Sequence, residues 1–207
     1  MKVFTYYDDF KRQKEPLIDL WKESWSKHGW TPTVLTPDDA QRHPNFRQFV
    51  NAVSRLPTVN NKKYELACYV RHLAMGVIGG GLLTDYDVMC YGFTPPAMTG
   101  IAAKHPEEKF ICTLHPRGVP CAIYGRLAGF EWFCAQMMNW PPAEHRVEPR
   151  GPHLSDMIIC QRLKLHRENA CINYPAEGWE KALLVHFSSG QSKERAKPDL
   201  IREVRPP

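Results

Sequence analysis

The 207-residue chain lacks the features that mark several common classes of protein. No stretch approaches the ~18–20 consecutive apolar residues that a membrane-spanning helix needs, so we expect no transmembrane segment. No run of five or more Lys or Arg residues occurs, so we expect no nucleic-acid partner. The Gly-x-Ser-x-Gly element of many serine hydrolases is also absent. The net charge of +5 instead favours small anionic partners such as nucleotide diphosphates or phospholipid headgroups.

Paired cysteines are absent as well. The seven cysteines are scattered, none forms a Cys-x-x-Cys pair, and most stand in apolar runs such as Phe110-Ile111-Cys112. In such runs a cysteine behaves as a small core residue. This usage is typical of a reducing compartment, and we expect the protein in the cytoplasm.

Short apolar runs and segments of helical periodicity alternate along the chain. Residues 2–7 predict a strand, 16–29 a helix that ends at a glycine, and 62–78 a long helix. This alternation predicts an α/β fold, a single Rossmann-like domain over residues 1–190 in which helices flank a mostly parallel central sheet. We expect a polar C-terminal tail or flap over residues 191–207.

The segment with most chemical content is GGGLLTDYDV, residues 79–88. Its apolar part predicts a short buried strand, and Asp85 and Asp87 follow at the carboxyl end, where open α/β sheets bind ligands. On an extended chain, acids separated by one residue point to the same side. Both carboxylates can then reach one Mn²⁺ or Mg²⁺, ions that prefer oxygen ligands and often bind phosphates. Asp-x-Asp by itself is more typical of a solvated turn, but the helix, glycines and strand before it favour the metal site.

Two further segments carry candidate binding residues. Thr5, Tyr6, Tyr7 and Asp8 end the first strand, where a base and ribose would dock, although an ordinary strand end explains them equally well. Asp156 opens a predicted helix beside Ser155 and either belongs to the helix cap or faces a substrate, and the cap is favoured.

Two parts of the sequence resemble glycosyltransferases of the GT-A fold. YELACYVR (64–71) and GGGLLTDYDV (79–88) are similar to the DXD sugar-transfer region of the group containing yeast-type mannosyltransferases, capsular-polysaccharide transferases and large clostridial toxins. The resemblance implies that Asp85 contacts ribose and metal and that Asp87 ligates the metal.

The same resemblance implies donor contacts for Glu65 and Arg71 on the long helix. VHFSSGQSK (185–193) resembles the His-x-x-Gly-x-x-Lys element of retaining GT-A enzymes, with one extra residue between His and Gly. In that element the histidine completes the metal shell and the lysine contacts the diphosphate. These roles would fall to His186 and Lys193, and an imidazole leaving a buried strand can indeed ligate Mn²⁺.

Together these features predict a metal-dependent glycosyltransferase, a hexosyltransferase using a UDP- or GDP-sugar donor and a carbohydrate or other hydroxyl acceptor, with retention of configuration. Asp85, Asp87 and His186 would hold Mn²⁺ or Mg²⁺, and Asp156 is the candidate catalytic residue. Two alternatives stay open. One is a non-catalytic module that binds a nucleotide-sugar or carbohydrate. The other is a nucleotidyltransferase, which also uses Asp-x-Asp but places its glycine pair further upstream than Gly81.

Overall fold

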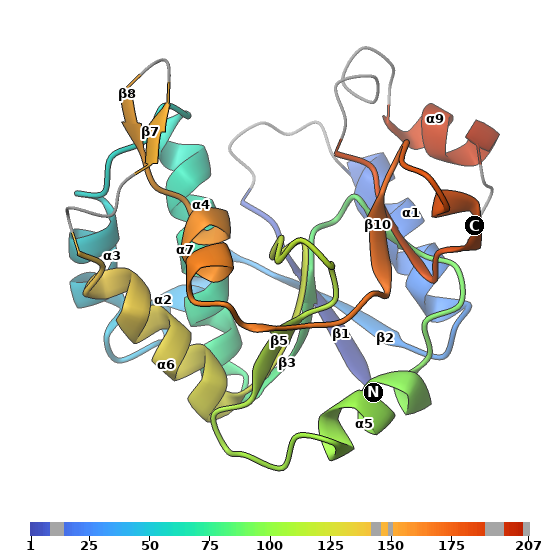
Figure 1. Cartoon of the computed structure of the whole chain (residues 1–207), viewed down its shortest axis with the longest axis horizontal. Coiled ribbons are helices and arrows are strands. Elements are labelled where there is room, and N and C mark those ends of the chain that lie inside the picture. Colours follow the sequence, from blue (N-terminus) through green and yellow to red (C-terminus); the bar gives the residue numbers. More distant parts are fainter. Residues whose placement is uncertain (9–14, 142–145, 149–150, 189–196, 205–207) are drawn as a thin grey trace.

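A six-stranded sheet forms the centre of the protein (Figure 1). The computed structural model describes residues 1–8, 15–141, 146–148, 151–188 and 197–204. The strands of this sheet are β1 (Lys2–Tyr6), β2 (Thr31–Leu35), β3 (Gly80–Thr84), β5 (Ile111–Thr113), β6 (Ala122–Arg126) and β9 (His166–Arg167). Their order across the sheet is β2-β1-β3-β6-β5-β9, and only the two pairings of β6 are antiparallel. The predicted α/β class with a mostly parallel sheet is confirmed.

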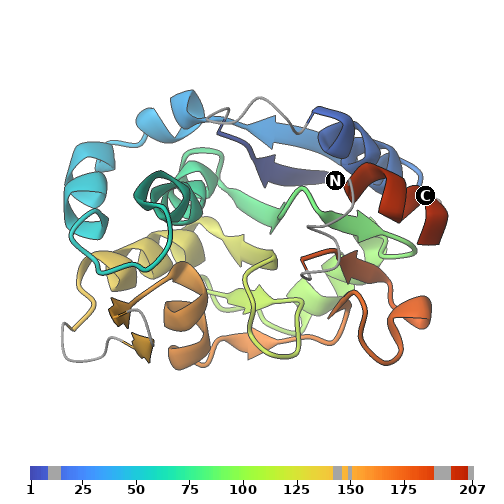
Figure 2. The same cartoon turned by 90° about the horizontal axis from the view of Figure 1, so that it is seen from above.

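Helices cover both faces of this sheet (Figure 1 and Figure 2). The described helices are α1 (Glu15–Ser26), α2 (Pro37–Gln41), α3 (Phe46–Val53), α4 (Lys62–Val77), α5 (Pro95–Ala103), α6 (Leu127–Met138), α7 (Asp156–Arg162) and α9 (Lys197–Val204), with a 3-10 turn η2 (Trp179–Lys181). Among the described residues, none of these helices is long and apolar enough to cross a membrane.

The two sheet faces pack against two separate hydrophobic cores, because strand side chains alternate between faces. Val3 and Leu82 point into a core shared with α1, α5 and α9. Phe4 and Leu83, the next residues along each strand, point into a core shared with α2, α3, α4, α6 and α7. Strand β3 is therefore buried on both sides up to Thr84, the residue before the aspartate pair.

A second, three-stranded sheet lies beside the carboxyl end of β3. It consists of β4 (Val88–Cys90), β10 (Cys171–Asn173) and β11 (Leu184–His186), with β11 between the other two. Strands β7 (Arg146–Glu148) and β8 (Gly151–His153) form a separate hairpin. The short sheet matters for function because β4 follows the aspartate pair and β11 ends at His186.

Two local predictions differ from the structure. Asp85-Tyr86-Asp87 is a turn between β3 and β4, so period-two alternation does not explain how the two acids come together. In the segment 191–207, expected as a polar tail, residues 197–204 form α9, which buries Leu200 and Ile201 against the core that contains α1. The rest of that segment lies outside the described residues.

Candidate functional site

The aspartate turn is fixed by backbone hydrogen bonds to three parts of the chain. The Asp85 amide donates to the Cys121 carbonyl at 2.8 Å, in the loop before β6. The Val88 amide donates back to the Asp85 carbonyl at 3.0 Å, and the Phe187 amide donates to the Asp87 carbonyl at 3.0 Å. Both acids are therefore held in place by the main chain before any ligand binds.

Two buried tryptophans of helix α1 form hydrogen bonds to the residues on either side of the same turn. The Trp21 indole donates to the Thr84 hydroxyl at 2.9 Å, and the Trp25 indole donates to the Val88 carbonyl at 3.0 Å. Both indole side chains are fully buried. A buried indole N–H needs such a partner, so these bonds tie helix α1 to the two ends of the turn.

His186 joins the two aspartates from the end of β11. Its Nε2 lies 3.4 Å from Asp87 Oδ1 and 3.7 Å from Asp85 Oδ2. Its Nδ1 lies 3.0 Å from Asn173 Oδ1, on the neighbouring residue of β10. An amide oxygen only accepts, so Nδ1 carries a proton in this contact and Nε2 faces the carboxylates.

These three residues fit a divalent cation. One ligand atom from each lies within 4.8 Å of the other two. Two carboxylates and one imidazole suit Mn²⁺ and also Mg²⁺, which binds carboxylates and substrate phosphates. Burial alone would lower the pKa of His186, but Cys121 and Asp87 raise it well above its ordinary value. A metal ion would therefore displace a proton from this site.

A buried ionic cluster adjoins the aspartate turn. Arg71 on α4 pairs with Asp85 through Nη1, and its Nη2 donates to Asp156 Oδ2 at 2.6 Å. His72 Nε2 lies 2.9 Å from the same Asp156 oxygen. Ser155, not Asp156, caps α7 by accepting from the Ile158 amide at 3.2 Å. The favoured capping role therefore holds for Ser155, while Asp156 holds the Arg71 guanidinium.

A cleft of about 610 Å³, within the usual range for ligand-binding pockets, is lined by Arg71, Asp156 and the three candidate ion ligands. Its walls come from the ends of β1, β10 and β11, one side of α4, the aspartate turn, the loop before β6 and the first residues of α7. A second cavity, between α3 and α4, is about 170 Å³ and too small for a nucleotide-sugar. The larger cleft is the candidate site.

Aromatic side chains line the part of the cleft at the end of β1. Tyr7 packs edge-on against Tyr86, with ring centroids 6.1 Å apart and an interplanar angle of 90°. Tyr6 and Asp8 line the same wall. Tyr86 stands between the two aspartates, so this aromatic pair is adjacent to the candidate metal ligands.

Two predicted donor-site residues are not brought into the cleft. Thr5 is fully buried and is absent from the cleft lining. Glu65 accepts from the Thr58 hydroxyl at 3.1 Å and the Asn60 amide at 2.9 Å, and so holds the loop before α4. Six positions separate Glu65 from Arg71 on a helix, which places the two side chains on different faces. Lys193 lies outside the described residues.

Sequence reasoning missed the residues that support the predicted ligands. Asn173 carries no motif, and only the parallel pairing of β10 with β11 places it beside His186. His115 is buried, is hydrogen-bonded to Asn173, and has its pKa lowered to about 4 by burial and by the charge of His186. Tyr86 was detectable, because it separates the two acids of the motif.

Sequence comparison gives a match over the N-terminal part of the chain. Residues 1–98 match a family model described as a domain of unknown function (DUF8765). The matched part contains Arg71, Asp85 and Asp87 but neither Asp156 nor His186. No curated protein matches the sequence.

Comparison of three-dimensional structures is more informative. The chain resembles a galactosyltransferase, LgtC, solved with donor and acceptor sugar analogues, with a TM-score of 0.61 and 9% identity over 99% of this chain and 95% of that one. It also resembles a glycosyltransferase involved in glycosylation of the major capsid of PBCV-1, with a TM-score of 0.54 and 12% identity over 96% and 98% of the two chains. The chain therefore shares the fold of these two glycosyltransferases. At these identities the likeness establishes the fold alone.

Proposed function

We propose that the protein is a metal-dependent glycosyltransferase that moves a hexose from a UDP- or GDP-sugar to a hydroxyl of a carbohydrate or other acceptor. The observation that carries this proposal is the convergence of Asp85, Asp87 and His186 in a cleft of about 610 Å³. The cleft opens at the carboxyl ends of β1 and β3, the usual ligand position in such sheets. The sequence resemblance adds retention of anomeric configuration to the proposal.

The proposed ion ligands are Asp85, Asp87 and His186. A bound Mn²⁺ or Mg²⁺ would supply positive charge to the departing diphosphate. Asn173 keeps the His186 imidazole in the tautomer that presents Nε2, and the fixed turn keeps the carboxylates from reorganising. The resemblance also assigns a diphosphate contact to Lys193.

Other residues of the cleft would orient the donor. Tyr7 and Tyr86 offer aromatic surfaces on which a nucleobase can pack, and Tyr6 lies beside them. Arg71 holds Asp85 in place and contributes positive charge near the diphosphate. Asp156 in turn holds Arg71 with an oxygen that already receives three hydrogen bonds, which favours a positioning role over attack on the anomeric carbon.

The test is release of nucleoside diphosphate from a panel of UDP- and GDP-sugars, with Mn²⁺, with Mg²⁺ and with EDTA. We expect turnover with Mn²⁺ or Mg²⁺ for at least one donor and none with EDTA. Asp87→Asn should lower kcat/KM roughly 100-fold or more, because it removes charge from the ion site. The matched control is Asp38→Asn, an exposed acid on α2, which should leave turnover unchanged.

Other outcomes of the same assay favour the alternatives. Calorimetric binding of a nucleotide-sugar without turnover on any acceptor would indicate a binding module. Pyrophosphate release from nucleoside triphosphates would indicate a nucleotidyltransferase. Metal-dependent turnover that survives Asp87→Asn would refute the site assignment.

A further inference from the structure

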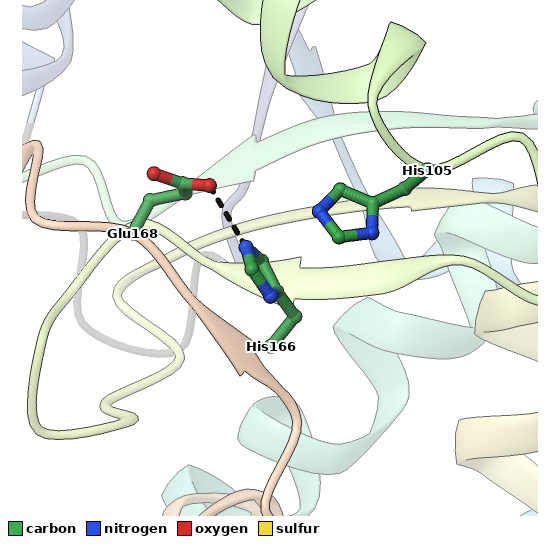
Figure 3. A group of neighbouring side chains, drawn as sticks. All are labelled: His105, His166 and Glu168. Carbon is green, nitrogen blue, oxygen red and sulfur yellow. Dashed lines mark hydrogen bonds and ion pairs between the residues drawn. The ribbon is translucent and has the colours of Figure 1, made fainter.

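A second cluster of metal-ligating side chains lies outside the cleft (Figure 3). His105 follows helix α5, His166 begins edge strand β9, and Glu168 follows that strand. One nitrogen or oxygen atom from each lies within 4.8 Å of the other two. None of the three lines the cleft that contains the aspartate turn.

The end of the central sheet brings His166 and Glu168 together. Strand β9 pairs with β5 through Cys112 opposite His166, and the Glu168 amide donates to the Thr113 carbonyl at 2.8 Å, which continues the ladder. Residues two apart on an extended strand point to the same side. The His166 Nε2 accordingly lies 2.8 Å from Glu168 Oε1.

The third side chain, His105, is held by its own surroundings. Its ring stacks on Phe110 with centroids 4.5 Å apart and an interplanar angle of 2°. Arg126 donates at 2.6 Å to the carbonyls of both His105 and Glu107, which fixes the loop between α5 and β5.

The orientation of the His105 ring leaves one nitrogen for the cluster. Its Nδ1 lies 3.3 Å from Glu107 Oε1, a contact that engages this nitrogen. The other ring nitrogen points toward His166 and Glu168 (Figure 3). An imidazole whose Nδ1 bonds a carboxylate while Nε2 faces a metal is the usual arrangement of a histidine ligand.

We propose that His105, His166 and Glu168 form a second metal site that binds Zn²⁺. Two imidazoles and one carboxylate are a donor set that zinc takes, with water in the fourth position of a tetrahedron. The side chains of these residues keep 25%, 40% and 29% of their surface exposed, so an ion can enter and retain a water.

The closest pair of donor atoms needs little adjustment to bind zinc. Two donors on a tetrahedral zinc ion, each about 2.0–2.1 Å from the metal, lie roughly 3.3 Å apart. The 2.8 Å contact between His166 and Glu168 must open by a few tenths of an ångström, and partly exposed side chains can rotate that far.

Such an ion would have a structural effect. It would link the loop after α5 to β9, the two-residue edge strand that follows α7. Because a ligand that binds only the folded state stabilises it, saturating Zn²⁺ should raise the melting temperature by about 5–10 °C. Strand β9 follows α7, and Asp156 is the first residue of α7. An ion that holds β9 would therefore also limit movement of the helix that carries this cleft residue.

The experiment uses the full chain without a histidine tag and carrying Asp87→Asn, which weakens the cleft cluster. Zn²⁺ is titrated against a chromophoric chelator, and Co²⁺ is followed by the visible absorption of a tetrahedral complex. We expect one equivalent of Zn²⁺, the Co²⁺ spectrum, and a rise in melting temperature. Neither measurement involves a sugar or turnover, so its result is separate from that of the proposed function.

Ligand substitutions decide whether this cluster holds the ion. His105→Gln, His166→Ala and Glu168→Gln should each weaken Zn²⁺ binding by roughly 100-fold and abolish the stabilisation. The control is His28→Gln, a histidine in the turn after α1 and outside both clusters, which should bind as the parent does. No binding by the Asp87→Asn protein, or binding unaffected by the three ligand substitutions, would overturn the proposal.

Discussion

The described part of the chain contains two three-residue clusters of metal-ligating side chains, and they differ in charge and in the burial of their side chains. The cleft cluster has two carboxylates and one imidazole, and Asp87 and His186 are only 8% and 7% exposed. The edge cluster has two imidazoles and one carboxylate on partly solvated side chains. Carboxylates brought together away from water need compensating cations, whereas a mostly neutral cluster at the surface needs none.

The surroundings of the two clusters reflect this difference. Arg71 and His186 lie against the acids of the cleft, and Arg71 is held in turn by Asp156. Beside the edge cluster, the Arg126 guanidinium bonds the main-chain carbonyls of His105 and Glu107. In the cleft, Arg71 thus joins Asp85 and Asp156 in one ionic network, whereas His166 and Glu168 of the edge cluster contact each other directly.

Removing the central cation of the cleft should have the largest effect. Arg71→Ala leaves Asp85 and Asp156 without their shared guanidinium, and we expect a loss of about 3–5 kcal/mol in the free energy of unfolding. Urea denaturation of the metal-free parent and variant measures this loss in unfolding free energy. The control is Arg42→Ala, which breaks an exposed pair with Asp39 and should cost about 1 kcal/mol or less. Equal losses in the two variants would contradict a connected network.

The pH dependence of stability should show a smaller effect. Burial alone would raise the pKa of Asp156, but Arg71 and His72 outweigh it and hold the pKa at about 2. A depressed pKa contributes stability above the unfolded value of about 3.9, and this contribution is lost as pH falls toward the folded value. Between pH 5 and pH 3 the parent should lose roughly 1 kcal/mol more than Asp156→Asn.

Urea unfolding of the parent and of Asp156→Asn at a series of pH values measures this difference. When the two slopes of unfolding free energy against pH are compared, the contributions of the other carboxylates cancel, and so does any pH-independent effect of the substitution. Parallel slopes would mean that Asp156 gains no net stabilisation from the cations around it.

The smallest expected effect is on stability when one carboxylate of each cluster is neutralised. Burial raises the pKa of Asp85, Arg71 opposes this, and Asp87 adds to it, so the folded metal-free protein disfavours the ionised form. Asp85→Asn should therefore stabilise the protein at neutral pH by about 0.5–1 kcal/mol while lowering metal-dependent turnover. Glu168→Gln in the partly solvated edge cluster should change stability by less than about 0.5 kcal/mol.

Melting curves in EDTA test this contrast. A higher melting temperature for Asp85→Asn and an unchanged one for Glu168→Gln would show that a carboxylate charge destabilises the metal-free protein in the cleft but not at the edge cluster. Destabilisation by Asp85→Asn would instead mean that its pairing with Arg71 outweighs both burial and repulsion.

The sequence predicted the frame of the fold better than the contacts within the site. Alternating side chains on β1 and β3 and the periodicity of α4 follow from local rules, so these elements were predictable. The hydrogen bonds from Trp21 and Trp25 to the aspartate turn span 63 residues and have no local signature. The same holds for Asn173 beside His186, which depends on how two short strands pair.

Two expected donor contacts do not line the cleft, and for a common physical reason. Thr5 was expected there because it ends the first strand, and Glu65 because of the family resemblance, but a strand or helix sends neighbouring side chains in different directions. Thr5 points into the core, and Glu65 bonds its own loop. Asp85 and Asp87 were correctly grouped for an incorrect reason, because a turn held by main-chain bonds replaces the extended segment.

The position of β11 between β10 and β4 affects when the cleft cluster can exist. During synthesis on the ribosome, both aspartates emerge long before His186 does. A nascent chain that ends before β11 carries the whole Asp-x-Asp motif but lacks the imidazole and the Phe187 amide that donates to the Asp87 carbonyl. The three-residue cluster is therefore completed late, after the C-terminal part of the chain has packed onto the part made first.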